Sequence, residues 1–81
     1  MLYKIGNMYL YYPEKSLEEQ LEEGIKLFLK RHGKEPDIGF FNPKYLEEER
    51  DYKSKEGIKM RLVPEKRELL KSFTLAVALD K

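Results

Sequence analysis

The chain has 81 residues, no cysteine and a net charge of only +1, because 16 lysines and arginines balance 15 aspartates and glutamates. The absence of cysteine excludes disulfides and thiolate metal sites, and the charge balance argues against a dedicated binder of duplex DNA or acidic membranes. No apolar run approaches the length of a transmembrane helix and no signal peptide opens the sequence, so we expect one cytoplasmic domain and no membrane association.

The composition also bears on stability and origin. Charged residues make up 38% of the chain, with Lys and Glu dominant, while the side-chain amides are restricted to Gln20, Asn7 and Asn42. This pattern is typical of thermophile proteins, although a small, surface-rich domain that needs solubility would show similar charge. A domain of this size buries a modest core and has no disulfide to stabilise it, so we expect self-association as a homodimer.

The first twelve residues are rich in tyrosine and aliphatic side chains, which favours extended structure. Gly6 and Asn7 interrupt this segment, and a Gly-Asn pair between two apolar runs is a signal for a two-residue hairpin turn. The alternative is one strand with a bulge at Gly6, and both remain open. Pro13 ends the extended segment in either case.

Residues 17–32 predict an amphipathic helix with a signal at each end. Ser16 and Glu19 have the spacing of a capping box, Gly33 suits a left-handed C-terminal cap, and Pro36 prevents continuation. Such a helix needs an apolar surface to pack against, and the strand-like segments on either side supply one. The apolar residues that recur at helical spacing are Leu17, Leu21, Ile25, Phe28 and Leu29.

Three further segments follow the helix. Residues 37–41 are mainly apolar and predict a buried strand, and residues 58–62 alternate apolar and basic side chains as in a half-exposed strand. Between them, Asn42 and Pro43 fit the N-cap and first position of a helix, so we expect a second, short helix over 44–52. The polar connection that follows it would be a mobile loop.

The C-terminal segment 65–79 is compatible with either a strand or a helix. Several of its large apolar residues recur at helical spacing, but we prefer the strand because period-two alternation continues without a gap. As a strand, it places Phe73, Leu75, Val77 and Leu79 on one face and small side chains on the other. The predicted fold is therefore α+β: a small sheet of about four strands with one long amphipathic helix packed on one face and a short second helix.

Residues that could carry catalysis or hold a metal are few and scattered. His32 is the only histidine, and it lies at the C-terminus of the predicted helix. The helix dipole and packing favour a histidine there, which explains its presence without a catalytic role. The helical glutamates lack the Glu-x-x-His pairing of carboxylate metal sites, and the sequence has no nucleophile elbow or phosphate-binding glycine loop. We therefore expect a protein that is not an enzyme and that binds no cofactor or metal.

Aromatic residues next to basic ones suggest one binding hypothesis. Exposed tyrosines on a sheet could stack the bases of single-stranded nucleic acid while nearby cations neutralise its backbone. The alternative is that the tyrosines pack on the long helix or form an edge that pairs with another copy. The candidate residues for the nucleic-acid surface are Lys4, Tyr9, Tyr11, Lys59 and Arg61.

The C-terminal strand provides a second hypothesis. Both of its faces are low in polarity, so it is either central in the sheet or part of an interface. If it is an edge, the sheet could extend across a homodimer. The candidate interface residues are then Phe73, Leu75, Val77 and Leu79.

The run from Arg31 to Pro36, followed by the buried strand and Asn42-Pro43, is similar in layout to small proteins from phage, archaeal-virus and thermophile genomes. The whole sequence predicts a non-enzymatic protein-interaction or assembly module that self-associates, from a thermophile or its phage or other mobile elements. The alternative function is the binding of single-stranded nucleic acid.

Overall fold

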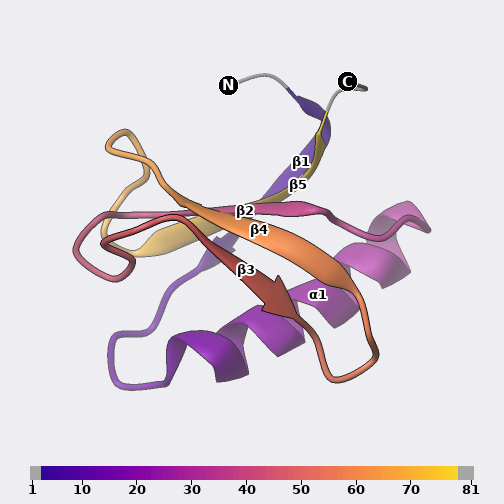
Figure 1. Cartoon of the computed structure of the whole chain (residues 1–81), viewed down its shortest axis with the longest axis horizontal. Helices are drawn as coiled ribbons and strands as arrows, with labels where there is room; N and C mark the ends of the chain where they lie inside the picture. The colour runs from indigo at the N-terminus through magenta and orange to yellow at the C-terminus, as the bar shows by residue number, and fades with distance from the viewer. Residues whose placement is uncertain (1–2, 79–81) are drawn as a thin grey trace.

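The computed structural model of the chain describes residues 3–78 (Figure 1). Over this range, one helix packs on one face of a five-stranded mixed sheet, and we call the opposite face of the sheet the outer face. The elements in chain order are β1 (Tyr3–Leu10), α1 (Leu17–His32), β2 (Ile38–Phe41), β3 (Arg50–Lys53), β4 (Lys59–Pro64) and β5 (Ser72–Ala78).

The last strand in the sequence, β5, is an interior strand of the sheet. The strand order is β1-β5-β2-β4-β3, and β5 pairs antiparallel with β1 on one side and with β2 on the other. β2 runs parallel to β4, and β3 pairs antiparallel with β4 at the second edge. The α+β prediction is confirmed, but the sheet has five strands rather than about four.

The predicted helix and both of its ends are confirmed. The Ser16 hydroxyl accepts a hydrogen bond from the Glu19 N–H at 3.1 Å, so Ser16 is the N-cap. At the other end, Gly33 adopts the left-handed conformation with φ of 67°, and its N–H donates to the Leu29 carbonyl at 2.8 Å. Glycine enters this conformation without the steric cost of a side chain. This helix is neither long enough nor apolar enough to cross a membrane.

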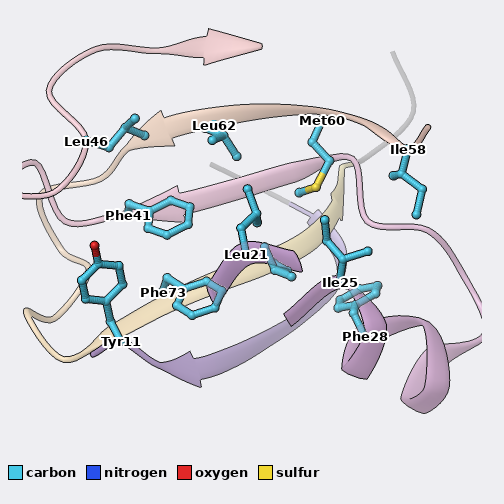
Figure 2. Close-up of a cluster of buried hydrophobic side chains, with 11 residues drawn as sticks. Tyr11, Leu21, Ile25, Phe28, Phe41, Leu46, Ile58, Met60, Leu62 and Phe73 are labelled. Atoms are coloured by element: carbon cyan, nitrogen blue, oxygen red, sulfur yellow. The ribbon is translucent and has the colours of Figure 1, made fainter. Parts of the chain in front are cut away.

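The core lies between α1 and the sheet, and Figure 2 shows the helical side chains facing those of the strands. The rings of Phe41 and Phe73, on adjacent strands, stack with their centroids 5.1 Å apart. The helix approaches this layer closely at Gly24, where an added Cβ would lie 3.1 Å from the Phe73 ring. The buried core residues are Tyr11, Leu21, Ile25, Phe28, Phe41, Leu46, Ile58, Met60, Leu62, Phe73 and Leu75.

The N-terminal segment forms one strand, so the hairpin alternative at Gly6-Asn7 is wrong. The ladder with β5 continues through the turn signal, with Gly6 opposite Ala76. The irregularity in register lies between Tyr3 and Ile5 rather than at Gly6. Pairing along the strand with a partner remote in sequence outweighs the local turn preference.

The predicted second helix over 44–52 is also wrong. Asn42 caps a single turn: its side-chain oxygen accepts from the Lys44 N–H at 2.9 Å. Its carbonyl accepts from the N–H groups of Tyr45 and Leu46 at 2.9 and 3.2 Å. β3 then begins and pairs with β4. The cap signal is satisfied by one turn, and the antiparallel ladder takes up the residues that follow.

The polar connection after β3 forms a tight hairpin turn between β3 and β4. The buried Ser54 hydroxyl accepts from the N–H groups of Glu56 and Ile58 at 3.2 and 3.0 Å. The Ser54 N–H in turn donates to the Ile58 carbonyl at 2.9 Å. These bonds fix the register of the β3–β4 pair.

The C-terminal segment is a strand, as preferred from its alternation, and Leu79 lies outside the described residues. The turn that leads into it is held by Glu68, whose buried carboxylate accepts from the hydroxyls of Ser72 and Thr74 at 2.5 and 2.9 Å. The Glu68 carbonyl also accepts from the side-chain amide of Asn42 at 2.7 Å. This turn is thereby tied both to β5 and to the turn after β2.

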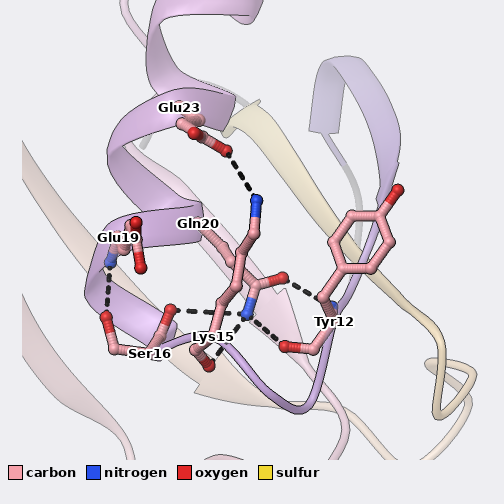
Figure 3. A network of polar contacts seen from close by, with 6 residues as sticks. All are labelled: Tyr12, Lys15, Ser16, Glu19, Gln20 and Glu23. Carbon is pink, nitrogen blue, oxygen red and sulfur yellow. Dashed lines mark hydrogen bonds and ion pairs between the residues drawn. The ribbon is translucent and has the colours of Figure 1, made fainter.

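The single glutamine of the chain closes the connection between β1 and α1 (Figure 3). The Gln20 side chain is 3% exposed, and its oxygen accepts from the Tyr12 N–H at 2.6 Å. Its amide nitrogen lies within hydrogen-bond distance of the carbonyls of Tyr12, Lys15 and Ser16, at 2.8, 3.2 and 3.3 Å. One side chain thus satisfies the backbone groups of a turn that has no ladder partner of its own.

Replacing Gln20 by Ala should lower the free energy of unfolding by about 2–3 kcal/mol, because several part-buried backbone groups lose their partner. Gln20→Glu is the matched control: it keeps the acceptor for the Tyr12 N–H and loses the donor to the carbonyls. Urea unfolding followed by circular dichroism measures both. We expect Gln20→Glu to be at least as destabilised as Gln20→Ala, because it places a buried carboxylate oxygen against the carbonyl oxygens that the amide nitrogen contacts in the wild type. Equal stability of Gln20→Ala and the wild type would contradict this role.

Candidate interaction edge

The outer side of β1 is one edge of the sheet, and we call the side of Tyr3–Leu10 turned away from β5 the β1 edge. Within residues 3–78, β1 pairs with β5 alone. The Tyr11 N–H donates to the Lys71 carbonyl at 2.8 Å, next to the ladder. Because backbone groups alternate in direction along an antiparallel pair, those of Gly6, Met8 and Leu10 point to the β1 edge.

Apolar side chains lie on both sides of this edge. On the outer face, Met8 and Leu10 are 61% and 65% exposed. On the helix side, Leu27 and Tyr12 are 53% and 42% exposed and line a hollow of about 230 Å³ together with Tyr9. An exposed strand of eight residues with apolar neighbours in both layers is a pairing site unless charge or cover protects it.

The opposite edge, β3, has this protection. β3 is only four residues long, and Arg50, Asp51 and Lys53 along it are exposed and charged. It is also tied to α1: the Tyr52 hydroxyl donates to the Glu22 carboxylate, and Arg50 forms a 2.8 Å ion pair with Glu18. Short, charged strands resist pairing with other chains. The two edges therefore differ, and β1 is the one suited to a partner strand.

The residues proposed for nucleic-acid stacking do not come together. Tyr11 is 6% exposed and stacks on Tyr45 with the ring centroids 4.0 Å apart, so it belongs to the core. Tyr9 packs on the same side, 5.6 Å from the Phe73 ring by centroids. Lys59 and Arg61 alternate with the buried residues of β4 and therefore lie on the outer face. The side chain of Lys4 lies outside the described residues.

The residues proposed for a C-terminal interface lie beneath the helix. Phe73 and Leu75 are 2% and 0% exposed and belong to the core, with Val77 packed beside it. Because β5 is paired on both sides, it cannot extend the sheet. Sequence analysis did not identify the surface formed by Met8, Leu10 and Leu27. The feature that could have revealed it is that these apolar residues occupy positions that do not face the core.

Polar groups near the β1 edge are packed rather than arranged for chemistry. The hydroxyl of Tyr9 is buried without a hydrogen-bond partner among the described residues, and burial raises the pKa of Tyr9 against smaller opposing effects of Arg31 and Asn7. The His32 Nε2 lies 3.3 Å from the Asn7 side-chain oxygen, and its ring centroid lies 4.6 Å from that of Phe28. Among the described residues, no group of three or more His, Cys, Asp or Glu side chains could hold a metal ion.

No family model matches the chain, and neither a curated protein nor a solved structure matches it significantly. The function of the β1 edge is therefore argued from its geometry and chemistry alone.

The contact that ties β3 to the helix predicts an alkaline loss of stability. Burial, then the hydrogen bond to Glu22 and its negative charge, raises the pKa of Tyr52 from 10.0 to about 12. A raised folded-state pKa gives stability that is complete below pH 10 and is lost as the pH rises toward 12. Urea unfolding at pH 9 and pH 11 should show a smaller decrease for Tyr52→Phe than for the wild type. An identical decrease in both proteins would contradict the assignment.

Proposed function

We propose that this chain is a non-enzymatic self-association module whose copies pair antiparallel through the β1 edge, forming one continuous sheet across a homodimer. The observation that carries the proposal is an eight-residue edge strand that exposes Met8 and Leu10, with the exposed Leu27 of α1 beside it. The heat-adapted composition and the origin in a thermophile or its mobile elements belong to the same proposal. A small domain without disulfides gains stability from such an interface.

The edge is complementary to a second copy of itself. Edge-facing backbone groups lie on even-numbered residues, so hydrogen-bonded pairs across a two-fold axis must join even residues to even residues. An axis at Met8 pairs Met8 with its own counterpart and places Leu10 opposite Gly6 of the second copy. Gly6 has no side chain, so the exposed Leu10 side chain gains room on the outer face. This register places the exposed Leu10 side chain opposite the smallest residue of the strand.

The helix layer adds to the same interface. Leu27 of α1 and Tyr12 after β1 flank the hollow beside the edge, and both are more exposed than is usual for large apolar side chains. A second copy paired along β1 would bring its own Leu27 toward this hollow. Sheet hydrogen bonds would then set the register, and apolar burial in the helix layer would add affinity.

Met8→Pro should abolish dimerisation and leave the fold intact, because the Met8 N–H points to the β1 edge and proline is tolerated on an edge strand. Sedimentation equilibrium measures the mass, and circular dichroism checks the fold. Leu69→Lys is the control. Leu69 lies in the turn before β5 and is 64% exposed, similar to Met8 at 61%. We expect the Leu69→Lys protein to remain a dimer. A wild type that is monomeric at millimolar concentration would end the proposal.

Cysteine cross-linking tests the register, since the chain has no cysteine of its own. Paired Cα atoms in a hydrogen-bonded antiparallel pair are about 5.5 Å apart, which suits a disulfide. Met8→Cys should therefore oxidise to a covalent dimer, whereas Asn7→Cys should cross-link poorly. Efficient cross-linking of Asn7→Cys alone would move the axis to Asn7, and the proposed fit of Leu10 on Gly6 would be wrong.

A further inference from the structure

The outer face carries a hollow that extends across β5, β2, β4 and β3. It has a volume of about 810 Å³, which is within the range of small-molecule sites. Its walls come from four strands or the residues next to them. The lining residues that matter are Asp37, Ile38, Lys53, Lys59, Arg61 and Ala78.

Two lysines face each other beside this hollow. Lys53 and Lys59 are directly paired in the β3–β4 ladder. The Ser54 N–H bonds to the Ile58 carbonyl, so Lys53 and Lys59 form the next, non-hydrogen-bonded pair, in which side chains are closest. Both are exposed, and neither forms an ion pair among the described residues. Like charges placed directly opposite each other destabilise a sheet.

The acidic groups of the hollow already have partners. One oxygen of Asp37 accepts from the Ala78 N–H at 2.8 Å. Asp51 lies 3.5 Å from the Arg61 guanidinium, which is also 3.7 Å from Glu49. Positive charge in this hollow is concentrated at the lysine pair, because no acidic side chain within residues 3–78 forms an ion pair with either lysine. Next to them, the half-buried Ala78 and the largely buried Ile38, which is 6% exposed, form the apolar part of the lining.

We infer that this hollow binds a small molecule with a doubly charged anionic group, such as a phosphate ester, between Lys53 and Lys59. Two ammonium groups supply charge-assisted hydrogen bonds to a dianion and lose their mutual repulsion when it binds. The apolar part of the ligand would lie against Ile38 and Ala78. The repulsion between the two lysines is a stability cost of the kind that binding sites retain.

The experiment uses phenyl phosphate and inorganic phosphate as probes on the full chain, followed by amide chemical shifts in two-dimensional NMR. Both should bind at the hollow and shift the amides of β3 and β4, with phenyl phosphate several-fold tighter because of its apolar ring. Equal affinity of the two probes would remove the apolar part of the proposal. Shifts absent at millimolar probe, or spread over lysines elsewhere, would overturn the site itself.

Lys53→Glu separates binding from folding. It should weaken phenyl phosphate binding by about tenfold or more and raise the midpoint of thermal unfolding by about 2–4 °C, because it replaces a repulsive pair with an attractive one. Lys34→Glu makes the same change of charge at an exposed lysine outside the hollow and should alter binding little. Lys59→Gln, which removes one charge without reversing it, should also weaken binding. Equal binding by the Lys53 and Lys34 variants would reduce the effect to general electrostatics and overturn the inference.

Discussion

Across the described chain, a single helix has to cover a sheet of five strands, and the rest of the fold depends on where that helix lies. It lies against the interior strand β5, where Gly24 allows close contact with Phe73 and Leu75. A helix is about 10 Å wide and strands are about 4.8 Å apart, so direct cover extends over only about two strands. β3, farther out, is joined to the helix by the polar contacts of Tyr52 and Arg50. The β1 edge keeps apolar side chains in both layers, and this difference between the edges underlies the proposed homodimer.

The features that could be predicted from sequence are those encoded locally. The helix has its cap at Ser16, its stop at Gly33 and a stripe whose spacing does not depend on distant residues. The prediction of a short second helix was wrong because the capping side chain of Asn42 needs only one turn. The residues that follow pair with β4, which lies farther along the sequence. The hairpin turn considered at Gly6 does not form for the same reason, because Gly6 pairs with β5, about 70 residues away in the sequence. Local signals indicate what a segment can form, and pairing decides among the options.

The candidate surfaces were harder to predict than the fold. The alternation of β1 showed two apolar faces, but only the position of α1 decides that Tyr9 and Tyr11 face inward and that Met8 and Leu10 face outward. The lysine pair depends on the register of a hairpin, because a shift of one residue would move one of the lysines to the helix side. No residue type at these positions is unusual by itself. Both surfaces become visible only when strand order and register are known.

The position of β5 also has a consequence for the order in which the molecule can assemble. β1 is made first, yet the strand it pairs with, over residues 72–78, is made after every other element of the described fold. β5 also lies between β1 and β2, so an interior strand of the sheet is the last to be made. Synthesis proceeds from the N-terminus, and a nascent chain therefore holds a tyrosine-rich strand without its neighbour until β5 has left the ribosome. Loss of β5 would therefore separate β1 from the other three strands rather than trim an edge.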